Sequence, residues 1–428
     1  MKNKKETLLI LTILITICII IFNRDKLYEA KYTEPKDTLL AITINGEIST
    51  TFPTTKYYET SVECTTGTGK VEWNGTKWVL TTNGITKGST KCNATFITKV
   101  PTFAETILAN NKVKAPITTP GVTISTASEA LLASTEDDYG TSYYFRGAVT
   151  NNYVEFANKC WRIVRVGGDG SVKLILHNDN PTGAANPCDA ANNSASAAFA
   201  HYNGSTYTSR FNENYDDNAY IGFKYGTPGS SKYETTHANT NKSTILTNLE
   251  TWYTNNLKTY ESVIDDTVWC NDKTNVTDTS YDPWSITPNG LGYAKNVTYY
   301  GATKRLVGTS GSAGGTGPSL KCNGELSKIN SKVGLITADE LAFAGYAYNI
   351  GNTTTYLQEN ATNTYWWSLS PYGFDVGSAG VWGVNGSAGY FDNYNVRGTY
   401  GVRPLISLKS TTNVTGEGTS SAPYIISM

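Results

Sequence analysis

The chain has 428 residues, enough for two or three domains, and its hydrophobic share of 39% allows ordinary buried cores rather than a disordered coat. The 35 Lys and Arg residues balance 36 Asp and Glu residues to a net charge of -1, with no basic block along the chain, so we expect no nucleic-acid partner. Tyr, Gly, Thr, Asn and Ser are abundant, which favours short strands and turns. We therefore expect a mainly β protein.

An uncharged run rich in Leu and Ile, Thr7–Phe22, follows three lysines at the N-terminus. A dozen such residues favour membrane insertion by on the order of 4 to 7 kcal/mol. As a helix the run is about 24 Å long, a little short of the hydrocarbon core, so a cleavable signal sequence is the alternative. No small-x-small cleavage site follows. We expect residues 1–22 to be a cytoplasmic tip and an uncut membrane anchor, in a single-pass protein of the cell membrane with its C-terminal part outside.

Setting aside Cys18 leaves six of the seven cysteines, without the Cys-x-x-Cys spacing or the nearby His of a zinc site. An even number of cysteines in an exported sequence favours disulfide bonds, with reduced core cysteines as the alternative. Many connectivities are open. Proximity in the sequence suggests three local pairs: Cys64 with Cys92, Cys160 with Cys188, and Cys270 with Cys322.

Residues 23–38 are a polar stalk, and residues 39–99 are predicted to form a small β module. Apolar and polar residues alternate in it, and the dipeptide Asn74-Gly75 between two short apolar runs is a strong hairpin signal. A disulfide across this module would contribute roughly 3 to 4 kcal/mol by loop closure. The stretch resembles immunoglobulin-like modules of bacterial surface proteins, which implies a small β-sandwich that acts as a spacer.

Residues 100–140 contain short helical patterns and a Pro-Ile-Thr-Thr-Pro break, and we predict a linker there. Strand patterns return in residues 141–428, the predicted main domain. Its first hairpin is well marked, because Trp161–Val166 can pair with Ser171–His177 across a turn rich in Gly and Asp.

Two later segments have helical signals. Apolar residues at i, i+3 and i+4 spacing run from Ile245 to Ile264, with Ser243 or Thr244 available as the N-cap. A capping box, Thr337–Glu340, begins the second helix. Only strands and turns are predicted after it. Two main helices against irregular antiparallel strands make an α+β arrangement that is mainly β.

Several motifs of this domain resemble bacterial C-type lectin-like domains. They are the strand Cys160–Arg165, the helix start Gly334–Glu340, the run Trp366–Pro371, and the closing strand Gly401–Ile406. This group includes the formylglycine-generating-enzyme fold and the variable proteins of diversity-generating retroelements. The sequence is most similar to uncharacterised bacterial cell-surface proteins of this kind, over about residues 140–425. The resemblance implies a C-type lectin-like domain.

The resemblance carries over no catalytic mechanism. The formylglycine-generating enzyme uses reactive cysteines late in its domain, and no cysteine follows Cys322. Calcium-dependent lectins use Glu-Pro-Asn or Gln-Pro-Asp, and neither tripeptide occurs. The acidic stretch Asn212–Asn218 lacks calcium-loop spacing, and no Gly-x-Ser-x-Gly motif is present. We expect no metal, no cofactor and no catalytic residue.

The stretch from Tyr372 to Tyr400 mixes aromatic residues with Gly, Ser and Asn, a composition typical of recognition surfaces. The alternative is that some of its aromatic residues, Trp382 and Phe374 above all, belong to the core. The predicted ligand-binding residues are Tyr372, Asp375, Asn385, Tyr390, Asp392, Asn393, Tyr394, Asn395 and Tyr400. We expect the four tyrosines to be partly exposed together, and Arg403 and Pro404 to lie in the scaffold. The variable residues of retroelement proteins lie in the corresponding region.

We expect an adhesin-like cell-surface protein that binds an unknown extracellular protein or glycan. The alternative is an extracellular hydrolase acting on cell-wall or host glycans through two carboxylates. An aromatic patch without converging acids favours binding, whereas two carboxyl groups facing each other in a cleft favour the enzyme.

Overall fold

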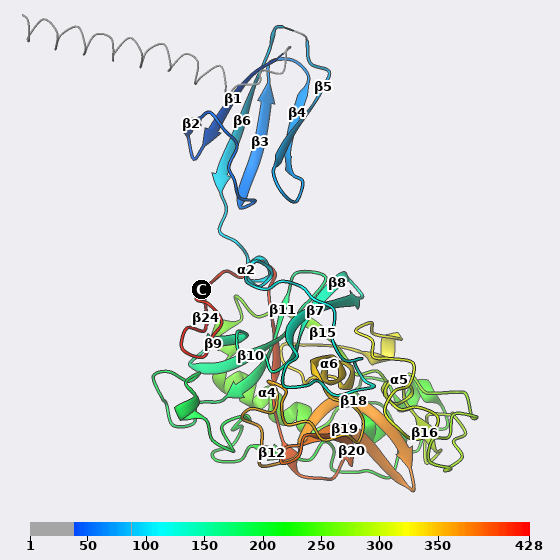
Figure 1. Ribbon diagram of the computed structural model, residues 1–428. Helices are drawn as coiled ribbons and strands as arrows, with labels where there is room; N and C mark the ends of the chain where they lie inside the picture. The colour runs from blue at the N-terminus through cyan, green and yellow to red at the C-terminus, as the bar shows by residue number, and fades with distance from the viewer. Residues whose placement is uncertain (1–37, 87) are drawn as a thin grey trace, which may run out of the picture. The chain divides into compact units, whose positions relative to one another are not determined.

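The computed structural model describes residues 38–86 and 88–428 (Figure 1). This part of the chain is mainly β, with several sheets and five α-helices. It divides into two compact units, with the boundary between Pro101 and Thr102.

The first unit is a small β structure. Its strands are β1 (Thr38–Ile44), β2 (Glu47–Ser49), β3 (Tyr58–Cys64), β4 (Thr68–Trp73), β5 (Trp78–Asn83) and β6 (Thr90–Thr98). One sheet has the order β2-β1-β6-β3, in which β1 and β6 run parallel, and β4 and β5 form the predicted hairpin around Asn74-Gly75. Trp78 and Phe96 form the centre of its core, with ring centroids 5.3 Å apart.

The second unit contains a large antiparallel sheet with one parallel pair. Its strands are β7 (Ala130–Asp137), β8 (Gly140–Gly147), β9 (Tyr153–Phe156), β10 (Lys159–Val166), β11 (Val172–Asn178), β22 (Leu405–Leu408), β23 (Val414–Thr415) and β24 (Tyr424–Ile426). The main order is β22-β11-β10-β9-β24-β23, and the β7-β8 hairpin joins through β10. The predicted first hairpin is confirmed, because Trp161 of β10 pairs with Leu176 of β11.

A second sheet carries the C-terminal half of the unit. It consists of β12 (Thr208–Ser209), β16 (Thr298–Tyr299), β18 (Trp366–Asp375), β19 (Ser378–Asn385), β20 (Tyr390–Asn395) and β21 (Tyr400–Gly401). Strands β18, β19 and β20 form an antiparallel meander, drawn in orange in Figure 1. Two further pairs are β13 (Lys224–Tyr225) with β14 (Asn241–Lys242), and β15 (Thr267–Cys270) with β17 (Lys328–Ser331).

The α-helices are α2 (Phe103–Asn110), α3 (Tyr233–Thr236), α4 (Thr244–Asn256), α5 (Gly301–Leu306) and α6 (Ala338–Ala344). Four 3-10 turns accompany them: η1 (Ala190–Asn192), η2 (Asn218–Ile221), η3 (Lys258–Tyr260) and η4 (Glu325–Ser327). Both predicted helices form with predicted caps, since Ser243 caps α4 and the capping box of Thr337 and Glu340 begins α6. The expected fold class is nevertheless wrong in its helices, because the described chain has five rather than two.

The expected membrane anchor and nearly all of the stalk lie outside the described residues. Within residues 38–86 and 88–428, no helix is long and apolar enough to cross a membrane. The expectation of a single-pass membrane protein is therefore corrected, and what the structure supports is a disulfide-bonded chain of extracellular type. Residues 100–140, expected to be a linker, contain α2 and β7, and from Thr102 on they belong to the second unit.

All three predicted disulfide bonds are present in the described part of the chain. The Cα–Cα distances are 4.0 Å for Cys64–Cys92, 4.9 Å for Cys160–Cys188 and 5.5 Å for Cys270–Cys322. The first bond links residues that face each other in β3 and β6, and it therefore holds the edge of the small sheet together.

The first two disulfides allow a matched test, because each joins residues 28 positions apart. Replacing Cys64 and Cys92 with Ala should lower the free energy of opening of β3 and β6 by about 3 kcal/mol, since loop closure no longer restricts the unfolded state. Hydrogen exchange should become faster in those strands and not in β10. The control replaces Cys160 and Cys188 and should give the opposite pattern. Equal acceleration in both units would contradict the local role of each bond.

Candidate functional site

The predicted ligand-binding residues all lie in β18 to β21, but they do not form one surface. Figure 1 shows β18, β19 and β20 side by side, on the opposite side of the second unit from the C-terminus. Tyr394 and Tyr400 come together on the outside, whereas Tyr372 is only 3% exposed. The expectation that four tyrosines share one exposed face is therefore wrong for Tyr372. Tyr390 is 43% exposed and is the first residue of β20, the strand that also carries Tyr394.

Three partly exposed rings form what we call the tyrosine surface: Tyr365, Tyr394 and Tyr400. The rings of Tyr365 and Tyr400 are stacked with centroids 5.2 Å apart, and Tyr394 meets Tyr365 edge-on at 5.0 Å. The third pair, Tyr394 and Tyr400, is 5.4 Å apart. Burial raises the pKa of the Tyr394 and Tyr400 hydroxyls, so both stay neutral at physiological pH. The three rings thus hold one another in a fixed cluster.

Beneath this surface the chain supplies one large ring and two glycines. Trp367 is fully buried and lies under Tyr400, with ring centroids 4.7 Å apart. A Cβ atom on Gly383 would approach the Tyr394 ring to 2.9 Å, and one on Gly398 would approach the Tyr400 ring to 2.5 Å. The two tyrosine rings therefore lie directly against glycine backbone.

Polar groups surround the tyrosine surface. Asn385 donates from Nδ2 to the Tyr365 hydroxyl at 3.2 Å, which places this predicted residue at the site. Tyr390, Asp392 and Tyr394 alternate along β20 and so share one face of the strand. Asn395 is exposed at the end of the strand and accepts from the Arg397 backbone.

Tyr372 belongs instead to an inner aromatic group. Its ring lies 5.0 Å from Trp382 and 5.4 Å from Trp284. Tyr348 packs against the same two tryptophans, at 5.7 and 6.0 Å. Trp284 and Tyr348 come from loops distant in the sequence, so the burial of Tyr372 depends on tertiary packing. Trp382 and Phe374 are core residues, as the alternative prediction held.

Two half-buried carboxyl groups lie beside the inner aromatic group. Burial raises the pKa of both Asp375 and Asp392, and for Asp392 hydrogen bonds from Asn393 partly oppose the shift. Both charges influence the hydroxyls of Tyr348 and Tyr372. Neither carboxylate forms an ion pair within the described chain. Carboxyl groups in this condition can accept hydrogen bonds from a ligand or exchange a proton with it.

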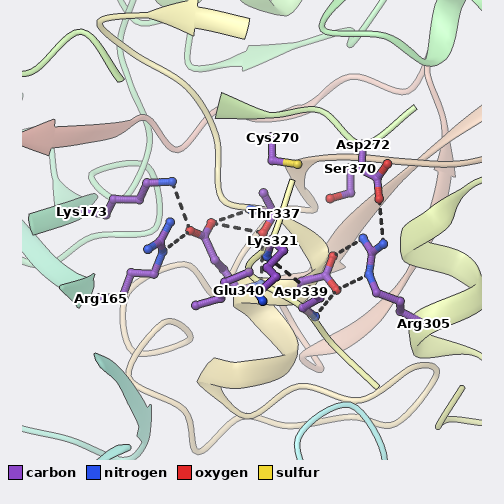
Figure 2. Close-up of a pocket in the computed structure, with 12 residues that line it drawn as sticks. Arg165, Lys173, Cys270, Asp272, Arg305, Lys321, Thr337, Asp339, Glu340 and Ser370 are labelled. Carbon is purple, nitrogen blue, oxygen red and sulfur yellow. Dashed lines mark hydrogen bonds and ion pairs between the residues drawn. The ribbon is translucent and has the colours of Figure 1, made fainter. Parts of the chain in front are cut away.

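A second constellation, which the sequence did not predict, lies at the start of α6 (Figure 2). Glu340 accepts from Arg165 at 2.9 Å and lies 3.4 Å from Lys173. Arg305 bridges two further acids, with Nε 2.7 Å from Asp339 and Nη1 2.7 Å from Asp272. We call these six residues the charged cluster. Every one of them has an opposite charge within 3.4 Å.

The cavity beside the charged cluster is about 20 Å³, enough for about one water molecule. Burial alone would raise the pKa of Glu340, but Lys173 and Arg165 outweigh it and lower the pKa to about 2. Burial lowers the pKa of Lys173 to about 8. Because the charges are mutually satisfied and no space is left for a substrate, we interpret the charged cluster as structural.

The described residues include no group of three or more His, Cys, Asp or Glu side chains placed to hold a metal ion. His177 and His237 are buried, and burial lowers the pKa of each, so both stay neutral at physiological pH. His201 contacts Asp179, with Nδ1 3.1 Å from the carboxylate. Their positions are those of structural side chains.

The Glu340 pKa gives a prediction for stability against pH. The pKa of Glu340 is about 2 in the folded state, below its unfolded value of 4.5. Its ionised carboxylate therefore stabilises the fold fully above pH 4.5, and this stabilisation is lost as the pH falls through 2. Replacing Glu340 with Gln should lower the free energy of unfolding at pH 7 by on the order of 3 kcal/mol and flatten its decline between pH 4.5 and 2.

Denaturant unfolding at several pH values measures this, and Glu325→Gln is the control. The side chain of Glu325 is 88% exposed and pairs only with Lys328 at the surface, so this variant should change neither value appreciably. An unchanged acid slope in Glu340→Gln would show that other carboxylates dominate acid unfolding.

The chain matches no family model, no curated protein and no solved structure. The resemblance to C-type lectin-like surface proteins, inferred from sequence motifs, therefore stays a prediction, and no activity is carried to this chain from a relative.

Proposed function

We propose that the chain is an extracellular ligand-binding protein and that the tyrosine surface makes the principal contact. The observation that carries the proposal is the mutual packing of Tyr365, Tyr394 and Tyr400 while all three remain partly exposed. Rings already fixed by their neighbours lose little conformational freedom when a ligand binds. Aromatic residues of this kind are frequent hot spots of recognition.

The chemistry around the tyrosine surface supports an extracellular protein or glycan as the ligand. The ring faces offer apolar area, and their neutral hydroxyls can donate and accept hydrogen bonds. Asn385 of β19 adds an amide group, which is hydrogen-bonded to the Tyr365 hydroxyl. Disulfide bonds in the described chain agree with a role outside the cell.

Replacing Tyr365 and Tyr394 together with Ala should weaken binding by on the order of 2 kcal/mol or more if they are hot spots, which is about 30-fold. A glycan and protein array screened with the full chain identifies the ligand, and titration gives the dissociation constants. The control is Tyr139→Ala, because Tyr139 is 62% exposed and lies outside the tyrosine surface, in the turn between β7 and β8. A double variant with a lower melting temperature that binds normally when folded would show that these tyrosines stabilise the fold and do not contact the ligand.

A second candidate function, a glycan hydrolase, is favoured by one observation. The pKa values of Asp375 and Asp392 are raised, and the charges of both raise the pKa of the same two hydroxyls, those of Tyr348 and Tyr372. A carboxyl group that keeps its proton to higher pH is suited to general acid catalysis, and glycosidases use a pair of such residues. The partly buried position of both groups is compatible with that chemistry.

Release of reducing sugar from peptidoglycan and from soluble host-type glycans tests this function. In a hydrolase, Asp375→Asn and Asp392→Asn should each lower the release at least 100-fold, because an amide neither donates a proton nor acts as a nucleophile. Asp266→Asn, at an exposed residue between η3 and β15, is the control. No release by the unaltered chain, or equal release by all variants, would leave ligand binding as the function.

A further inference from the structure

A second hollow lies at the N-terminal end of α4, separate from the charged cluster. Its volume is about 270 Å³. The residues that matter for its chemistry are Asn212, Glu213, Asn214, Tyr225, Thr244 and Asn248. They come from the loop before η2, from β13 and from the first turns of α4. We call this hollow the polar pocket.

Two asparagine side chains of the polar pocket use their amide nitrogen in a hydrogen bond to the protein and leave their amide oxygen without one. Asn212 is 3% exposed and donates from Nδ2 to the Tyr220 carbonyl at 2.9 Å. Asn248 donates from Nδ2 to Ser209 Oγ at 2.8 Å. Within the described chain, no donor reaches the Oδ1 atom of either residue. The polar pocket therefore has two amide oxygens left to accept hydrogen bonds, one on a buried and one on a half-buried side chain that the protein already holds through Nδ2.

The remaining groups of the polar pocket are hydroxyls and an aromatic ring. The hydroxyls of Thr244 and Tyr225 have no hydrogen-bond partner among the described residues, and the Tyr225 ring is set edge-on against Tyr220 at 5.5 Å. A half-buried tyrosine fixed in this way offers a face for the C–H groups of a ligand. The ligand that fits has several hydroxyl groups and an apolar face.

Charge argues against an anionic ligand. Lys242, which lines the pocket, pairs with Glu250 at 2.6 Å, and Glu213 of the lining pairs with Arg210 at 2.6 Å. The two charged residues that line the polar pocket, Glu213 and Lys242, are therefore both paired, and no cation of the described chain is left free there. A neutral ligand needs no charged partner in the pocket and can donate hydrogen bonds to the two amide oxygens.

The polar pocket lies next to the tyrosine surface. Ser209, which receives the Asn248 hydrogen bond, is in β12 and pairs with Tyr400 in β21. The volume is slightly below the roughly 300 to 1,000 Å³ of pockets that hold drug-sized ligands, and suits a single sugar ring. We propose that the polar pocket binds one pyranose ring of a neutral glycan whose next residues reach the tyrosine surface. This inference rests on the proposed ligand-binding function and names its ligand class.

Two threonines of α4 provide a matched pair of variants. Both are exposed, and both donate their hydroxyl to the carbonyl four residues back, Thr247 to Ser243 and Thr251 to Thr247. Only Thr247 lines the polar pocket. Thr247→Tyr should fill the pocket, whereas Thr251→Tyr adds the same ring one turn further along the helix.

The full chain is titrated with the neutral sugars N-acetylglucosamine, galactose and mannose, and with N-acetylneuraminic acid as the anionic probe. Saturation-transfer NMR measures the binding of each sugar. At least one neutral sugar should bind the unaltered chain and Thr251→Tyr equally, and should bind Thr247→Tyr at least 10-fold more weakly. Binding of the anionic sugar alone, binding of none of the four, or equal binding to both variants would overturn the proposal.

Tyr365→Ala separates this inference from the proposed function. A neutral sugar whose binding survives Tyr365→Ala and is lost in Thr247→Tyr supports the polar pocket even if the tyrosine surface fails. An array ligand that is lost in Tyr365→Ala and kept in Thr247→Tyr supports the tyrosine surface and removes the polar pocket.

Discussion

The second unit depends on one buried cation between its two large sheets. Arg403 is fully buried, and its guanidinium donates to the carbonyls of Leu176 in β11 and Leu357. The same group lies over the Trp366 ring in β18, 4.8 Å from its centroid. Burial lowers the pKa of Arg403 to about 10, which still leaves it charged at physiological pH. Carbonyl dipoles and an aromatic face together compensate the loss of hydration.

This arrangement fixes the place where recognition is proposed. Tyr365 directly precedes Trp366, and Tyr400 lies three residues before Arg403. Tyr365 is therefore next in the chain to a ring that the guanidinium contacts, and Tyr400 is close in the chain to the arginine itself. Other arginines act in a similar way: Arg146 pairs with Glu129 at 3.0 Å and donates to the carbonyls that end α6. Because buried ion pairs contribute little net stability, we expect the main effect of this one to be the selection of one arrangement of irregular loops.

Local patterns in the sequence predicted local structure well. The hairpin of β10 and β11, the caps of α4 and α6, and the three disulfides depend on neighbours in the chain, and all are present. Whether a given aromatic side chain is buried or exposed could not be predicted from such patterns. Tyr372 is buried because Trp284 and Tyr348 cover it, and Tyr365 joins the surface although it lies outside the predicted stretch. The charged cluster is hidden in the sequence for the same reason, since its members are up to 175 positions apart.

Gly383 and Gly398, which support two rings of the tyrosine surface, have a consequence for how this protein can diverge. A ring that lies against glycine backbone has little side-chain packing on that side, so we expect its exchange for a smaller residue to leave the strand in place. The glycines themselves cannot change as easily, because a methyl group at either position collides with the ring above. Substitution at this surface should therefore be tolerated better in the outward side chains than in the two glycines, because only the outward changes leave the strand backbone as it is.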